Sequence, residues 1–118
     1  MTKYDFFLKN TKLLNDNFNI VPLLYGSLGL GVLTNTSLNA DDIDILIPPN
    51  YVNGGKWTEF KTLLESNGYV LIDEHEHTFR KDGVDYSYAS VEGLKGFAGI
   101  DLHDIEIRDV SNTKFMLL

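Results

Sequence analysis

The most constraining feature of this chain is segment 42–47, where acidic and apolar residues alternate before the apolar residues continue alone. Successive side chains of a strand point to opposite faces, so Asp42 and Asp44 project to one face while the intervening isoleucines enter the core. Pro48-Pro49 follows directly and ends any such strand. The segment therefore predicts a strand with one end at a polar site and the other end buried.

Asp42 and Asp44 repel each other if both are ionised in the folded protein. Carboxylates two residues apart on one strand face are separated by ~7 Å or less. Two like charges repel by roughly 4 kcal/mol at 4 Å and intermediate dielectric. A divalent cation with oxygen ligands relieves this repulsion, and Mg²⁺ is the usual one beside phosphate groups. The alternative is a solvated strand end without any ligand.

A second motif lies upstream of the acidic strand. Segment 20–25 is a short apolar run that predicts a buried strand, and residues 28–33 are expected to form a short helix. Between them, Gly26 permits a sharp backbone turn and Ser27 offers a hydroxyl. Free N–H groups at the start of a helix favour an anion. The two motifs together predict a phosphate site beside a metal site.

The rest of the chain predicts a mixture of helices and strands. A helix is expected over 2–18, begun by Thr2 and Asp5. A second helix would have Trp57, Phe60, Leu63 and Leu64 on its apolar face and Gly68 at its end. The remaining expected elements are strands over 69–73, 77–81 and 84–90, a short helix over 90–97, and short strands over 105–110 and 115–118. Asp82-Gly83 is typical of a two-residue hairpin turn. This order predicts an α+β fold, with one mixed sheet flanked by helices, in a single domain spanning residues 1–118.

The two motifs resemble the nucleotidyltransferase superfamily, which includes DNA polymerase beta and the small lincosamide-type nucleotidyltransferases. The family pattern is an apolar residue, Gly, then Gly or Ser, followed later by Asp-apolar-Asp-apolar on a neighbouring strand. Tyr25-Gly26-Ser27 and Asp42-Ile43-Asp44-Ile45 occupy those places. The family takes a third acidic residue from a later strand, and Val84-Asp85-Tyr86 matches that description.

The resemblance implies a Mg²⁺-dependent enzyme that moves a nucleoside monophosphate from an NTP to a hydroxyl group. By this resemblance Asp42 and Asp44 would hold two Mg²⁺ ions, ~3.5–4 Å apart. Asp85 would share the second ion and accept the proton of the acceptor. Gly26 and Ser27 would bind the nucleotide phosphates.

Two other functions stay open at this stage. Active superfamily members often carry Lys or Arg near the Gly-Ser turn, and residues 26–44 contain neither. A non-catalytic module of the same fold, which binds nucleotide or a protein partner, is therefore one alternative. The other is a metal hydrolase built on Glu74 to His77, where His75 and His77 would share a strand face with a spacing that suits zinc.

The charge and composition of the chain limit the classes of partner that we expect. The chain of 118 residues has a formal net charge of −7, which disfavours extended nucleic-acid binding and leaves a small molecule or a protein as acceptor. It has no cysteine, no basic-then-apolar leader and no apolar run near the ~18 residues that cross a bilayer. We therefore expect a cytoplasmic protein without membrane association. Nothing in the sequence specifies an oligomeric state.

Overall fold

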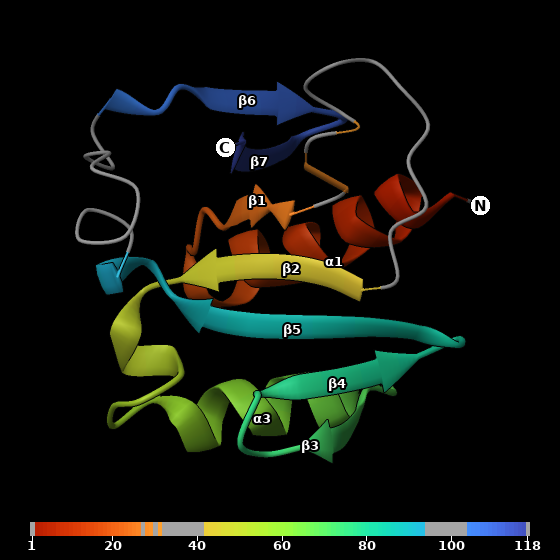
Figure 1. The fold of residues 1–118 in the computed structure, drawn as a ribbon, viewed down its shortest axis with the longest axis vertical. Helices are drawn as coiled ribbons and strands as arrows, with labels where there is room; N and C mark the ends of the chain where they lie inside the picture. The colour runs from red at the N-terminus through yellow and green to blue at the C-terminus, as the bar shows by residue number, and fades with distance from the viewer. Residues whose placement is uncertain (1, 27, 30, 32–41, 94–103, 118) are drawn as a thin grey trace.

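One seven-stranded sheet organises the computed structural model, which describes residues 2–26, 28–29, 31, 42–93 and 104–117. Its strands are β1 (Leu23–Tyr25), β2 (Asp42–Ile47), β3 (Val70–Asp73), β4 (Thr78–Lys81), β5 (Val84–Ser90), β6 (Ile107–Val110) and β7 (Thr113–Leu117). They lie in the order β3-β4-β5-β2-β1-β7-β6 (Figure 1). Strand β2 is antiparallel to β1 and parallel to β5, and β7 is parallel to β1. The predicted mixed sheet is confirmed.

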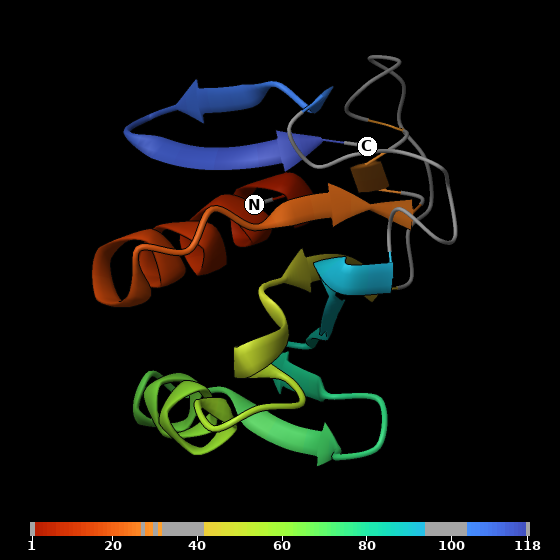
Figure 2. The ribbon, with the colours of Figure 1, turned by 90° about the vertical axis from the view of Figure 1, so that its left-hand side faces the viewer.

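Two α-helices, α1 (Lys3–Phe18) and α3 (Trp57–Ser66), cover one face of this sheet (Figure 2). Thr2 begins α1 as predicted: Asp5 N–H donates to Thr2 Oγ1 (3.2 Å), and Thr2 N–H donates to Asp5 Oδ2 (2.8 Å). Short 3₁₀ helices lie at Pro49–Tyr51 and Val91–Gly93. The expected α+β class is thus confirmed, and α1 and α3 lie on the same face of the sheet.

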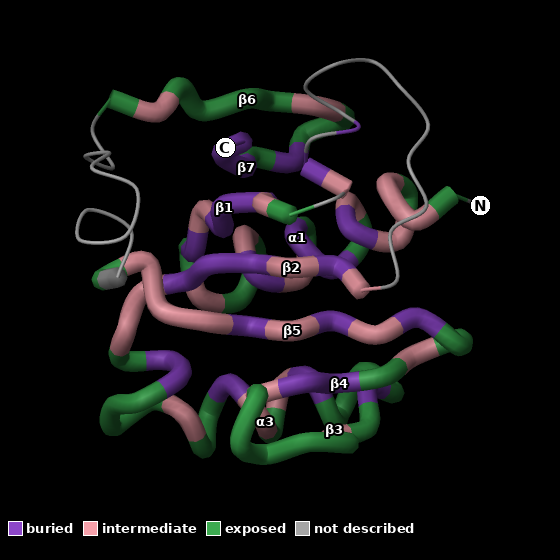
Figure 3. Tube along the Cα trace, in the orientation of Figure 1, coloured by how far each residue is buried: buried purple, intermediate pink, exposed green. Residues whose placement is uncertain are grey.

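The core lies between the helices and the sheet face that they cover. Its fully buried residues include Phe7, Leu14, Leu24, Ile43, Ile45, Ile47, Phe60, Leu64, Phe79 and Phe115. Burial alternates along most of β5 and along residues 42–45 of β2 (Figure 3). Leu46 of β2 is buried as well, in a second cluster with Leu23 and Met116. The remaining side chains of these strands point to the other face, which is where Asp42, Asp44 and Asp85 belong.

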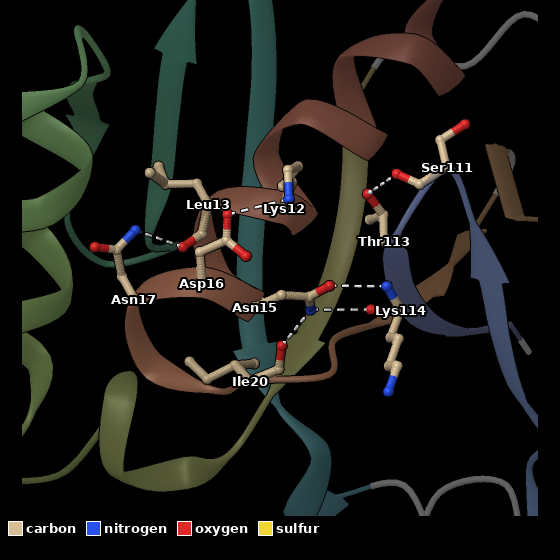
Figure 4. A network of polar contacts seen from close by, with 9 residues as sticks. All are labelled: Lys12, Leu13, Asn15, Asp16, Asn17, Ile20, Ser111, Thr113 and Lys114. Carbon is tan, nitrogen blue, oxygen red and sulfur yellow. Dashed lines mark hydrogen bonds and ion pairs between the residues drawn. The ribbon is translucent and has the colours of Figure 1, made fainter.

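The end of α1 is tied to the hairpin formed by β6 and β7. The Asn15 side chain donates to the carbonyls of Ile20 (2.7 Å) and Lys114 (3.1 Å), and it accepts from the Lys114 N–H (2.7 Å) (Figure 4). Asn19 then ends the helix with a positive φ of 55°. These contacts fix the direction in which the chain enters β1.

Several predicted boundaries differ from the structure. The first strand begins at Leu23 and not at Ile20, because Pro22 has no N–H for a strand ladder; its carbonyl instead accepts from Met116 N–H (2.8 Å). Of the helix predicted over 28–33, residues 28, 29 and 31 are described and are helical. Of the helix predicted over 90–97, residues 94–97 lie outside the described ranges, as does Ser27. No helix within those ranges has both the length and the hydropathy to cross a membrane.

Candidate functional site

Strands β2 and β5 bring the three predicted acidic residues to one face of the sheet. Asp42 and Asp44 are half-buried on β2, and the isoleucines between and after them are fully buried on the other face. Asp85 of β5 is the register partner of Asp42 in the parallel pair. Neighbouring strands lie about 4.8 Å apart, so side chains from these two partners stand side by side. The alternation seen in the sequence therefore produces a common acidic face.

This acidic face lines an open pocket of about 490 Å³. Five carboxylates contribute to its wall, those of Asp42, Asp44, Asp73, Glu76 and Asp85. Tyr25, Ile72, Thr78, Ser87, Tyr88 and Ala89 complete the lining, and no Lys or Arg is among these described residues. The pocket therefore presents oxygen donors and negative charge, together with one exposed apolar side chain at Ile72.

Gly26 places backbone directly against the acidic strand. Its φ is +74°, and a Cβ at this residue would lie 2.5 Å from Oδ2 of Asp44. Both facts exclude an ordinary side chain here, the first by backbone strain and the second by overlap. The sequence assigned Gly26 to a tight turn, and the structure adds the close approach to Asp44. Ser27, expected to bind phosphate, lies outside the described residues.

The electrostatics of Asp44 match a crowded carboxylate. Burial, followed by the nearby charge of Asp42, raises the pKa of Asp44 above its ordinary value of 3.8. Tyr25 is the register partner of Asp44 on β1, and burial together with the charges of Asp44 and Glu76 raises the pKa of its hydroxyl. Each added negative charge in the pocket is thus unfavourable in the folded protein.

Asp85 has a different environment, because Arg80 holds its carboxylate. Arg80 Nε donates to Asp85 Oδ1 (2.6 Å) and Arg80 Nη2 donates to Asp85 Oδ2 (3.1 Å), which is a bidentate ion pair. Hydrogen bonds from Arg80 hold the pKa of Asp85 below its ordinary range. Arg80 was not among the site residues predicted from the sequence. A two-residue turn at Asp82-Gly83 makes residues 80 and 85 cross-strand partners, so the signal was present.

The donor set fits a hard cation in chemical type. Asp42 and Asp44 offer carboxylate oxygens from one strand face, which are the ligands Mg²⁺ prefers. Within the described ranges, no three His, Asp or Glu side chains are placed to hold one metal ion together. Asp85, the expected third ligand, is engaged with Arg80 instead. Two of the three predicted carboxylates are therefore available to a cation as the structure stands.

The placement expected for the histidine cluster is wrong. Residues 74–77 form the turn between β3 and β4, so His75 and His77 do not share a strand face. Glu76 N–H donates to Asp73 Oδ1 (3.1 Å) within this turn, and His77 has a φ of +52°. The His75 side chain is 93% exposed, whereas the His77 ring packs edge-on against Trp57 with centroids 4.8 Å apart. A charged stretch between two predicted strands is also typical of a solvated turn, and residues 74–77 form such a turn.

Known proteins were compared with this sequence and structure. No family model matches the chain. "Uncharacterized protein YnaI" of Bacillus subtilis (strain 168) is 38% identical over 118 residues, which cover 100% of this chain and 75% of that protein. The crystal structure of an antigenic nucleotidyltransferase-like protein from Paracoccidioides brasiliensis aligns with a TM-score of 0.59 and 16% identity.

That structural alignment covers 96% of this chain but only 59% of the Paracoccidioides protein. At this identity the likeness establishes the fold, and it confirms the nucleotidyltransferase-like fold that the two sequence motifs predicted. The alignment with YnaI extends over the entire sequence at an identity that establishes common descent. The chain thus belongs to the family of Bacillus subtilis YnaI and has a nucleotidyltransferase-like fold.

Proposed function

We propose that this protein transfers a nucleoside monophosphate from an NTP to a hydroxyl group of a small-molecule or protein acceptor, with Mg²⁺ as cofactor. The observation that carries the proposal is the common face of Asp42, Asp44 and Asp85 at one pocket, with the Gly26 turn packed against Asp44. Folding alone gives no reason to gather these carboxylates or to place glycine backbone against one of them.

Each site residue would have a separate role in this reaction. Asp42 and Asp44 would hold the cation, which when bound neutralises phosphate charge and stabilises the entering and leaving oxygens. The Gly26 turn and the Ser27 hydroxyl would orient the phosphates. The acceptor oxygen bonds to the α-phosphorus, the bond from that phosphorus to the bridging oxygen breaks, and pyrophosphate leaves. Asp85 would take the proton of the acceptor hydroxyl.

The pocket also bears on the acceptor. Its five carboxylates, and a net charge of −7 for the chain, repel a polyanionic acceptor such as a nucleic acid. We place the reaction in the cytoplasm, with which a chain without cysteine is compatible.

A second function has one observation in its favour. The bidentate pair of Arg80 and Asp85 occupies the third carboxylate, as it would in a module that binds nucleotide or a protein partner without transferring it. The hydrolase alternative based on His75 and His77 has no comparable support, because the turn separates the two rings.

Transfer is tested with purified protein, each of four α-labelled NTPs, Mg²⁺ and a panel of hydroxyl-bearing small molecules and proteins. Label in an acceptor, lost in Asp44→Asn and retained in the exposed control Asp109→Asn, supports transfer. Label that the protein retains without passing it on supports the binding module. If the label is neither retained by the protein nor transferred to an acceptor, both proposed functions are contradicted. Hydrolysis that survives Asp44→Asn but not His75→Ala would point to the hydrolase.

A further inference from the structure

The ion pair between Arg80 and Asp85 is well formed but open to solvent. Two nitrogens of the Arg80 guanidinium each donate to one carboxylate oxygen of Asp85, at 2.6 and 3.1 Å. The Arg80 side chain is nevertheless 54% exposed, and that of Asp85 is 23% exposed. Solvent-exposed pairs of this kind contribute little net stability, so the guanidinium can leave with little loss of stability when another anion competes for it.

The location of the pair connects it to the candidate metal site. Asp85 is the register partner of Asp42, and the charge of Asp42 also acts on Arg80. The Arg80 guanidinium therefore lies at the edge of the acidic face and neutralises one of its carboxylates. While both oxygens of Asp85 accept hydrogen bonds from Arg80, fewer lone pairs of Asp85 remain for a cation.

Phosphate is the anion that suits a released Arg80. A guanidinium fork binds phosphate oxygens in the same bidentate manner as it binds a carboxylate. The described lining of the pocket contains no Lys or Arg, so a triphosphate entering there would meet Arg80 at its edge. The charge of Lys3, at the start of α1, makes a further and smaller contribution to lowering the pKa of Asp85.

We propose that Arg80 is a phosphate-binding residue that exchanges partners when nucleotide arrives. Its guanidinium moves from the Asp85 carboxylate to a phosphate group of the nucleotide. Asp85 is then released to act with Asp42 and Asp44. This inference rests on the proposed function, and it assigns to Arg80 two opposite effects: Arg80 weakens cation binding before nucleotide arrives and strengthens triphosphate binding afterwards.

The test measures both effects separately, without an activity assay. Binding of Mn²⁺ alone is titrated by electron paramagnetic resonance for the parent, Arg80→Gln and Lys81→Gln. Lys81 is the matched control, since it is the next residue of β4 and its Nζ lies 4.9 Å from the Tyr69 ring centroid, away from Asp85. Binding of inorganic triphosphate in saturating Mg²⁺ is measured by calorimetry on the same three proteins.

We expect Arg80→Gln to bind Mn²⁺ about tenfold more tightly than the parent, the lower end of what an adjacent opposite charge does to a carboxylate. The same variant should bind triphosphate about tenfold more weakly, and Lys81→Gln should match the parent within about twofold in both titrations. A substitution that only damaged the fold would weaken the binding of Mn²⁺ and the binding of triphosphate alike. Circular dichroism melts verify folding, and Arg80→Met, which keeps the apolar stem, replaces Arg80→Gln if that variant unfolds.

Unchanged or weaker Mn²⁺ binding in Arg80→Gln overturns the inference, as does unchanged triphosphate binding. Failure of the proposed function has a different signature. In that case the parent binds neither NTP nor triphosphate in Mg²⁺, whereas the Mn²⁺ titration of Arg80→Gln still shows whether Arg80 restrains Asp85.

Discussion

Asp42 of β2 and Asp85 of β5 are register partners in a parallel strand pair, although α3 and the β3–β4 hairpin lie between them in the sequence. A shift of the register by one residue would turn every side chain of β5 to the other face. Tyr86 and Tyr88 are almost fully buried in the core and prevent such a shift. The packing of two tyrosines on one face therefore fixes the acidic residue on the other.

Gly26→Ala should destabilise the protein by about 1–3 kcal/mol and abolish Mg²⁺-dependent nucleotide binding. An alanine at this position would have to adopt a positive φ, and its Cβ would overlap Oδ2 of Asp44. Gly83→Ala is the control, because its φ of +76° is similar but no atom lies within 4 Å of the added Cβ. Urea unfolding gives both stabilities. Equal losses in the two variants would show that the approach to Asp44 adds nothing.

Asp44→Asn should stabilise the metal-free protein at pH 7.5 by a few tenths to about 1 kcal/mol, after allowance for solvent screening. The pKa of Asp44 is raised in the folded state, so its ionisation cost is absent below the ordinary value of 3.8 and grows as pH rises past it. The advantage of the variant should therefore shrink toward pH 4. Mg²⁺ should raise the melting temperature of the parent more than that of the variant. Destabilisation by Asp44→Asn at pH 7.5 would identify Asp44 as a structural acceptor.

Arg80→Gln should show the opposite dependence on pH. The pKa of Asp85 is lowered by Arg80, so the pair stabilises the folded protein above the ordinary carboxyl pKa and loses this effect as pH falls through the lowered value. Because the pair is exposed, the variant should be only slightly less stable than the parent at pH 7.5, and the difference should shrink toward pH 2. Thermal melts across that range, with Lys81→Gln as control, measure it. A difference that persists unchanged into acid would assign the loss to packing of the arginine stem.

Asn15→Ala should lower the free energy of unfolding by about 1–3 kcal/mol, since it removes three hydrogen bonds that join α1 to Ile20 and Lys114. Asn17→Ala is the comparison, because that side chain makes one local bond to the Leu13 carbonyl (2.9 Å). Hydrogen exchange of the Lys114 amide should accelerate in Asn15→Ala alone. An unaltered Lys114 amide would show that β7 holds its place without Asn15.

Local patterns in the sequence predicted the parts of the site that depend on local rules. Alternation in 42–47 fixes the face of Asp42 and Asp44, and Asp82-Gly83 forms the turn that it predicts, with φ values of +53° and +76°. That turn also dictates the pairing of Arg80 with Asp85, which only a cross-strand argument reveals.

Other features depend on distant residues. The parallel pairing of Leu24 with Leu117 joins segments near opposite ends of the sequence, and no local periodicity contains that information. His77 lies in the turn before β4, where its ring contacts Trp57 on a helix earlier in the chain. Similarly, the close approach of Gly26 to Asp44 requires the register of β1 on β2, which two separate motifs do not specify.

The place of β1 in the sheet has a consequence for how the protein is made. Strand β1, which leads into the Gly26 turn, pairs with β2 on one side and with β7 on the other. Residues 113–117 are synthesised after residues 23–25, so one edge of β1 stays exposed in the nascent chain until β7 has emerged. Pairings between such distant segments form slowly. In pulse-labelled refolding we expect the β7 amides to gain protection later than those of the β4–β5 hairpin. The candidate site would then be completed only once β7 has paired with β1, and β1 would be exposed to unwanted strand pairing until that moment.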